Sequence, residues 1–185
     1  MKAILVFLFL LFTSTIMNAQ DQDPWAEYMT PSAIHSLLSQ YTGSFTMEIT
    51  MSMGEGNEPT VITVDSEHQM LLGGRFLEMK QQGLMMGMEY QAMMTLGFNN
   101  TDKKMALTTI TNMGTGTLSL YGDWNENTNS AILLGTLTNP VSKSTINVKQ
   151  VITFVDNNIL LIESFDKEGD KPEIKTVQYK LIRKV

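Results

Sequence analysis

One stretch of the chain decides the fold: Val151-Ile152-Thr153-Phe154-Val155-Asp156-Asn157-Asn158-Ile159-Leu160-Leu161-Ile162. Runs of β-branched, aromatic and aliphatic residues stand on both sides of Asp156-Asn157-Asn158, and such residues favour strands. Asp and Asn tolerate the left-handed backbone conformation that a tight hairpin turn requires. The stretch therefore predicts two antiparallel strands joined by a short turn.

The same pattern of short strands and turn residues continues outward over most of the chain. We predict strands over residues 44–53, 60–72, 75–81, 84–97, 104–112, 116–121, 131–138, 145–155, 159–165 and 173–183, with a tight turn at Gln82-Gly83. Strands at such spacing, with no helices between them, predict a meander. Because an open meander leaves two long edges that invite aggregation, we expect an all-β fold, an antiparallel up-and-down barrel of about ten strands.

The first twenty residues predict a secretory signal rather than part of the fold. Lys2 precedes an apolar run over residues 3–12, and Asn18-Ala19-Gln20 follows after a short polar stretch. This is the order of a signal peptide, which we expect to be cleaved after Ala19 or Gln20; a membrane anchor is the alternative. No later segment reaches the roughly 20 apolar residues of a membrane span. We therefore predict a secreted or periplasmic bacterial protein with no membrane span once the signal is removed.

Residues 21–43 are predicted to form an arm and a helix that precede the barrel domain of residues 44–185. The arm, 21–30, is expected to be extended and pinned by burial of Trp25 and Tyr28. A helix is predicted over residues 31–40, because Pro31 suits the first helical position and apolar residues then recur at helical spacing. We expect this helix to cover one end of the barrel, and Trp25 is a candidate cap for the barrel mouth.

The composition excludes several classes of function. The chain has 185 residues, no cysteine and 13 basic against 19 acidic residues. The lack of cysteine excludes disulfides, thiolate zinc sites, iron–sulfur clusters and thiol catalysis. The net charge of −6 argues against a nucleic-acid-binding surface. The sequence also lacks the hydrolase elbow, the zinc-protease pattern and the phosphate loop, so we assign no catalytic residue, no metal site and no cofactor, and favour a protein that is not an enzyme.

Methionine is the unusual component, with 15 residues in the chain. Seven of them lie between Met70 and Met94, in the predicted second to fourth strands. In the strand over 84–97, alternation places Leu84, Met86, Met88, Tyr90, Ala92 and Met94 on one face and Met85, Gly87, Glu89, Gln91 and Met93 on the other. The second face, with its polar residues, suits a cavity wall. Three interpretations stay open: core packing, a wall for an apolar ligand and a soft-metal site for copper.

Nine residues are candidates for ligand binding: Arg75, Glu78, Met86, Met88, Glu89, Tyr90, Gln91, Met94 and Asn112. Arg75 is suited either to pairing with a carboxylate at the barrel end or to holding an anionic ligand head. Asn112 begins a turn whose glycines could expose backbone N–H groups. Other interpretations are a structural barrel filled by its own side chains, a cavity enzyme with Glu78, Glu89 or His68 as base, and a haem protein with His35 as the iron ligand.

Seven motifs together resemble a known bacterial family, the domain of unknown function 1579. They are Thr30-Pro31 with His35 and Leu38, Gly74-Arg75-Phe76-Leu77-Glu78, Met85-Met86-Gly87-Met88, Gly97-Phe98-Asn99-Asn100, Asn112-Met113-Gly114-Thr115-Gly116, Thr138-Asn139-Pro140 and Val151-Ile152-Thr153-Phe154-Val155-Asp156. The resemblance covers essentially the whole chain after the signal. It implies a calycin-like barrel, similar to lipocalins and fatty-acid-binding proteins, closed around an interior cavity; the family has no agreed activity.

The chain departs from the family pattern in one strand. Members commonly carry Trp and Asp where this sequence has Thr109 and Thr111. The departure implies that an activity depending on those residues is absent or altered here. Together, the sequence predicts an exported β-barrel that binds a small hydrophobic or amphipathic ligand in its interior.

Overall fold

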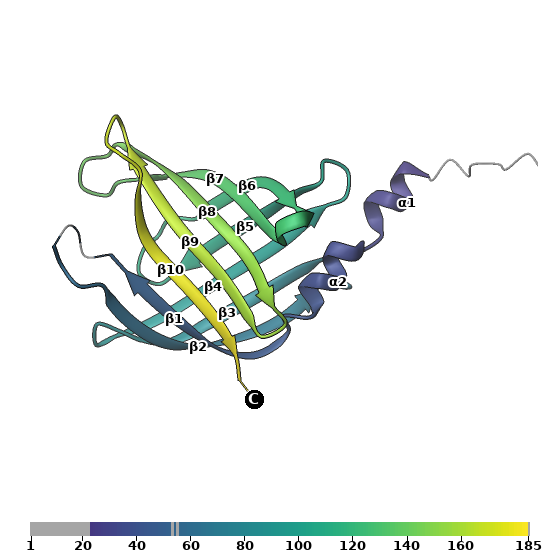
Figure 1. The fold of residues 1–185 in the computed structure, drawn as a ribbon, viewed down its shortest axis with the longest axis horizontal. Coiled ribbons are helices and arrows are strands. Elements are labelled where there is room, and N and C mark those ends of the chain that lie inside the picture. Colours follow the sequence, from purple (N-terminus) through teal and green to yellow (C-terminus); the bar gives the residue numbers. More distant parts are fainter. Residues whose placement is uncertain (1–22, 53, 55, 185) are drawn as a thin grey trace, which may run out of the picture.

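The structure, a computed structural model, describes residues 23–52, 54 and 56–184, and its strands form a closed antiparallel barrel (Figure 1). The ten strands are β1 Gly43–Met51, β2 Thr60–Leu71, β3 Phe76–Met85, β4 Met88–Asn99, β5 Lys104–Thr111, β6 Leu118–Asn125, β7 Ser130–Thr138, β8 Thr145–Asp156, β9 Ile159–Glu168 and β10 Ile174–Arg183. The predicted barrel class and strand number are confirmed. The signal segment and Met53, assigned to the first strand, lie outside the described residues.

The barrel closes because the first and last strands pair with each other. The β1–β10 register runs from Phe45 opposite Arg183 to Met51 opposite Val177, and every other strand pairs with its neighbours in sequence. Closure removes the two free edges of the meander. The hairpin between β8 and β9 turns where the sequence predicts it, with Asn158 N–H donating to Asp156 Oδ1 at 2.7 Å.

The turn predicted at Gln82-Gly83 is wrong. Strand β3 continues through both residues to Met85, and the turn lies at Met86-Gly87, where φ is 51° and 79°. Gly83 serves packing instead of turning, because a Cβ there would lie 2.8 Å from Val64 Cγ1 on the neighbouring strand. The glycine that looked like a turn signal therefore allows two strands to approach closely.

Two short helices precede the barrel, α1 Pro24–Met29 and α2 Ala33–Ser39. The predicted helix corresponds to α2, but the predicted extended arm is wrong from Pro24 onward. Asp23 Oδ1 accepts the Trp25 N–H at 3.0 Å and Pro24 occupies the first helical position, so this segment starts a helix. Trp25 is 67% exposed and is neither pinned by burial nor a cap over the barrel. None of the described helices has the length and apolar character to cross a membrane.

The core lies inside the barrel and is closed at one end by α2. The most buried side chains there include Leu38 of α2, Phe45 of β1 and Leu181 of β10, each with no exposed surface. Methionines fill further core positions on β1, β3, β4 and β5: Met47, Met79, Met94 and Met105. Flexible thioethers suit such irregular interior space.

The barrel interior as the candidate binding site

The two ends of the barrel differ in what closes them. We call the end that carries α2 and the turns at 72–75, 126–129 and 157–158 the helix end. The opposite end, which we call the loop end, carries only the connections between strands, among them 139–144 and 169–173 (Figure 1). The chain enters the barrel at the helix end, so the loop end has no helix over it among the described residues.

Partly exposed inward-facing apolar side chains are more numerous at the loop end than at the helix end, where Met70, Phe98 and Trp124 are partly exposed. On every strand, alternate residues face the interior, as the burial pattern of β4 shows for Tyr90, Ala92, Met94 and Leu96. The inward-facing apolar side chains of the loop end are only partly buried against the core: Met51, Ile62, Met85, Leu118, Leu137, Ile146 and Val177. More of the accessible inward-facing apolar surface therefore lies at the loop end.

A chain of hydrogen bonds crosses the interior from β3 to the start of β1. Gln81 Nε2 donates to Ser66 Oγ at 3.1 Å, Ser66 Oγ lies 2.8 Å from His68 Nε2, and His68 Nδ1 lies 2.8 Å from Tyr41 O. Because a carbonyl oxygen can only accept, Nδ1 carries the proton and Nε2 accepts from Ser66. Burial lowers the pKa of His68 to about 4, so the ring is neutral at pH 7.

Two glutamines of the interior leave an acceptor unused. Gln81 and Gln150 are 2% and 4% exposed, and their Oε1 atoms receive no hydrogen bond from the described residues. Gln150 Nε2 points to Ser164 Oγ at 3.4 Å. Two other buried polar atoms of the described residues lack a hydrogen-bond partner: Asn100 Oδ1 and Trp124 Nε1, both towards the helix end. A buried acceptor without a donor costs roughly 1–3 kcal/mol, so two such oxygens in one interior indicate a place for an external donor.

Three further polar side chains face the same interior. Burial is the main cause that raises the pKa of Tyr90 above its usual value, and the nearby Tyr179 adds to the shift. Burial likewise raises the pKa of Tyr179, and the charge of Asp166 raises it further. The pKa of Asp166 is raised by burial, against an opposing hydrogen bond from Thr176. The strand registers place Tyr179 and Asp166 on the inner faces of the paired strands β10 and β9, and Tyr90 faces inward from β4. Neither phenol makes a hydrogen bond within the described part of the chain.

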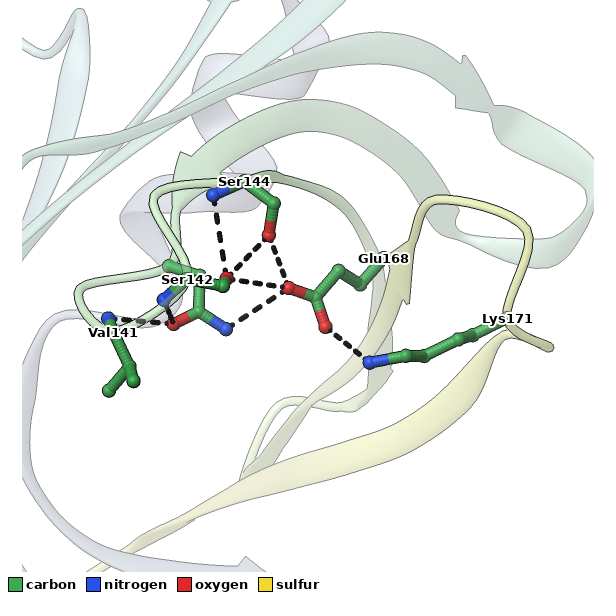
Figure 2. Close-up of polar contacts among 6 residues, drawn as sticks. Val141, Ser142, Ser144, Glu168 and Lys171 are labelled. Carbon is green, nitrogen blue, oxygen red and sulfur yellow. Dashed lines mark hydrogen bonds and ion pairs between the residues drawn. The ribbon is translucent and has the colours of Figure 1, made fainter.

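Glu168 fastens two loops together at the rim of the loop end, as Figure 2 shows. Its Oε1 accepts from Asn139 Nδ2 at 3.2 Å, from Ser142 Oγ at 3.0 Å and from Ser144 Oγ, and its Oε2 pairs with Lys171 Nζ at 2.7 Å. Lys171, then Ser144 and Ser142, lower the pKa of Glu168 to about 2. The sequence marked Asn139-Pro140 as a turn but offered no signal that joined it to Glu168.

The strand with the predicted methionine wall contributes two candidates to the interior. Tyr90 and Met94 are buried there, at 6% and 2% exposure. Met88 lies on the same side of β4 but is 53% exposed at the loop end, and Met86 stands in the turn at 62%. The apolar face of the strand thus points inward.

The polar face of β4, which we expected to form the cavity wall, lies on the outside of the barrel. Gln91 Nε2 donates to Glu89 Oε1 at 2.7 Å. Asn112 binds backbone groups of both residues, accepting from Gln91 N–H and donating to Glu89 O, each at 2.9 Å. The expected orientation is corrected for a physical reason: Tyr90, Ala92 and Met94 remove more apolar surface from water than the polar face could. Asn112 ties two strands together.

Arg75 and Glu78 also lie away from the interior. Arg75, in the turn before β3, donates to Leu72 O at 3.0 Å and to Met29 O at the end of α1, not to a carboxylate. Glu78 lies on the outer wall, where Gln69 at 2.6 Å and Lys80 at 3.0 Å lower its pKa. Arg75 therefore attaches the helices to the barrel.

Of the residues named for haem binding and catalysis, His35 stands in α2, His68 faces the interior from β2, and Glu78 and Glu89 lie on the outer wall. His35 Nδ1 accepts from Ser32 N–H at 2.9 Å and lies 3.0 Å from Ser32 Oγ, so this ring nitrogen is engaged at the start of α2. Of the three bases considered, Glu78 and Glu89 point outward and His68 is neutral and buried. Within the described residues, no three His, Asp or Glu side chains come together as a metal site would require.

A groove of about 350 Å³ lies on the outside of the helix end, between the helices and the barrel wall. Its lining includes His35, Arg75, Phe98 and Asn100, so it joins three of the motifs that carry the family resemblance. Asn100 Nδ2 donates to the carbonyls of Glu27 and Thr30 at 2.8 and 2.7 Å. The polar groups of these motifs therefore serve mainly to hold the helices in place.

Comparisons with known proteins agree with this architecture. The model of a family described as a protein of unknown function, DUF1579, matches residues 30–183. The crystal structure of Rv2717c from M. tuberculosis is similar, with a TM-score of 0.58 and 14% identity over 84% of this chain and 100% of that one. At this identity the likeness concerns the fold alone. None of the curated proteins matches the chain. The family predicted from the seven motifs is confirmed, and this chain belongs to the DUF1579 family of proteins of unknown function.

Proposed function

We propose that this protein binds a small hydrophobic or amphipathic molecule in the barrel interior, entering from the loop end. One observation carries the proposal: apolar inward-facing side chains stay partly exposed around the loop end, next to buried acceptors that no donor satisfies. Binding sites for small molecules combine an apolar lining with a few polar groups that fix the ligand's orientation.

We further propose that the protein works outside the cytoplasm, in the periplasm or as a secreted protein. The pattern of residues 1–20 supports this, with Lys2, an apolar run of about ten residues and Asn18-Ala19-Gln20. Native mass spectrometry of protein purified from its host tests this and the binding proposal together. The protein mass reports whether cleavage follows Ala19 or Gln20, and an added mass that survives purification reports a ligand.

A binding assay with a matched pair of variants tests the location of the site. N-phenyl-1-naphthylamine, an uncharged apolar fluorophore, serves as the probe. Thr109 faces inward and pairs with the buried Met94, whereas its neighbour Thr108 is exposed on the outer wall. We expect Thr109→Trp to fill the interior and weaken probe binding by about tenfold or more, since an indole there removes the space the probe needs. Thr108→Trp should bind the probe like the wild type.

Circular dichroism and thermal unfolding establish that each variant folds. If Thr109→Trp does not, Ile146→Trp, at another inward-facing position of the loop end, replaces it, with exposed Asn147 as the matched outer position. Equal probe binding by the inner and outer variants would place the probe outside the interior. Failure of the wild type to bind the probe, with no added mass on the native protein, would favour the alternative of a structural barrel filled by its own side chains.

A further inference from the structure

Resting on the proposed function, we infer the chemical class of the ligand: an amphiphile whose polar end is uncharged or cationic, donates hydrogen bonds and lies inward, with its apolar part towards the loop end. An anionic amphiphile such as a fatty acid is excluded by the same features. The inference follows from which charges and which hydrogen-bonding groups the interior contains.

The interior offers no cation to an anionic ligand. Every described lysine on a strand alternates with an inward-facing neighbour and so projects outside the barrel: Lys80, Lys104, Lys149, Lys167, Lys175 and Lys180. Arg183 faces inward, but at the helix end, where it donates to Thr42 O at 2.7 Å and to Gln40 O and lies over the Phe45 ring. A carboxylate brought into the interior would therefore lose its hydration without gaining a counter-charge.

The groups that the interior does offer are acceptors. Gln81 Oε1 is fixed as an acceptor, because Gln81 Nε2 already donates to Ser66, whose own hydroxyl proton is directed to His68. Gln150 Oε1 is the second free acceptor, and the Asp166 carboxyl, which pairs in register with Ile174 nearer the loop end, is a further acceptor group. A hydroxyl, amide N–H or ammonium group of the ligand would donate hydrogen bonds to these oxygens. A carboxylate can only accept hydrogen bonds, so it would leave them without a donor.

The apolar part of such a ligand would lie towards the loop end. The partly buried side chains there are apolar, as Met51, Leu118 and Leu137 show. The rim beyond them also carries large exposed apolar side chains on three separate hairpins: Leu84, Met86 and Met88 before and after the β3–β4 turn, Val141 in the loop 139–144, and Ile174 at the start of β10. These apolar groups surround the entrance, beside the Glu168 cluster, whereas the acceptors of Gln81 and Gln150 are buried, which orients an amphiphile with its polar end inward.

A displacement experiment with three ligands of equal chain length tests the inference. Decanol, decylamine and decanoate are titrated against the N-phenyl-1-naphthylamine complex of the whole protein. We expect decanol and decylamine to displace the probe at concentrations about tenfold or more below that of decanoate, because a mispaired buried polar group costs a factor of this order. Displacement by decanoate at equal or lower concentration, or by none of the three, would overturn the inference.

Two substitutions assign the preference to the named acceptors. Asp166→Asn should weaken decylamine about fivefold or more while leaving decanol unchanged, since only the amine gains from a negative charge. Gln81→Met, which keeps the side chain's length but removes its acceptor, should weaken decanol and decylamine alike. Glu163→Gln, an outer-wall carboxylate on the same strand paired with Lys175, is the control and should change neither ligand. Unchanged ligand preference in both interior variants would contradict the assignment.

The outcomes separate this inference from the function on which it rests. Probe binding that Thr109→Trp abolishes supports the proposed function whichever decyl ligand displaces the probe best. Preference for decanoate would then leave interior binding in place and refute only the class of ligand. Failure of the wild type to bind the probe, with no added mass on the native protein, would refute both.

Discussion

The two ends of the barrel are built from the same ten strands but differ in how their side chains pack. At the helix end, Phe45 stacks on the His68 ring with centroids 4.2 Å apart, and the Arg183 guanidinium covers its other side at 4.6 Å. At the loop end, inward-facing Met88 is 53% exposed and the interior acceptors of Gln81 and Gln150 lack donors. The Phe45 contacts pack the helix end closely, whereas the loop end leaves more inward-facing apolar surface exposed.

The difference separates stability from binding within one small domain. Residues that pack completely contribute most to the free energy of folding, whereas a binding site needs surface that the protein itself does not cover. Substitutions at the helix end should therefore unfold the protein, and substitutions at the loop end should change loops or ligands without unfolding it.

Phe45→Ala should have the largest effect, because it removes a fully buried ring together with its contacts to His68 and Arg183. We expect a loss of about 3–5 kcal/mol in the free energy of unfolding, measured by urea denaturation. Met88→Ala at the loop end is the control and should cost about 0.5 kcal/mol or less. Similar losses in the two variants would abolish the distinction between the ends.

Lowering the pH should reduce the free energy of unfolding through His68, which packs at the helix end. The pKa of His68 is lowered from 6.5 to about 4 in the folded protein, so the unfolded chain binds the proton more readily between these values. Stability from this group is complete above pH 6.5 and is lost as the pH falls to about 4, by roughly 3 kcal/mol in total. Burial also lowers the pKa of His35, so this residue likewise makes the folded protein less stable as the pH falls.

Unfolding free energies measured between pH 8 and pH 4 check this expectation. His68→Gln should be less stable than the wild type at pH 8, and the gap should narrow as the pH falls, because the variant has no proton to take up there. Parallel pH curves would show that His68 does not contribute to the acid sensitivity.

Glu168→Gln should change the free energy of unfolding least of these variants. Its effect should be confined to the loops at the rim of the loop end. The variant loses the charge that holds Ser142, Ser144 and Lys171 around one carboxylate. We expect faster hydrogen exchange in the loop 139–144, with an unchanged urea midpoint. The wild-type carboxylate keeps its charge above pH 4.5 and loses it only as the pH falls towards 2. Glu163→Gln is the control, and equal exchange in both variants would show that Glu168 does not hold the loop.

Much of the fold could be predicted because the sequence pattern of each strand is visible within a short stretch of the chain. Seven of the predicted strands agree with the observed ones to within three residues at each end, since alternating side chains and turn residues are short-range signals. Gly83 shows where such signals fail. A glycine that permits a turn and a glycine that permits close approach to Val64 look alike in sequence. The Met86-Gly87 turn was missed because methionine seldom takes a positive φ.

The candidate site could be predicted less well than the fold. The sequence identified β4 as a wall of the barrel, and the structure places Tyr90 and Met94 inside it. It also assigned Glu89 and Gln91 to that wall, because alternation defines two faces without saying which one faces inward. The groups now central to the proposal, Gln81, Gln150 and Asp166, stand on separate strands and share no local motif.

The sequence by itself determined the class of fold, the family and the absence of cysteine chemistry, because composition, periodicity and turn residues act over short stretches of chain. Only the tertiary structure decided which face of each strand points inward, which end α2 closes and which polar atoms remain without a partner. Those properties depend on strand register and on residues far apart in sequence, such as Gln81 on β3 and Gln150 on β8. The whole closed barrel is needed to bring them to one interior.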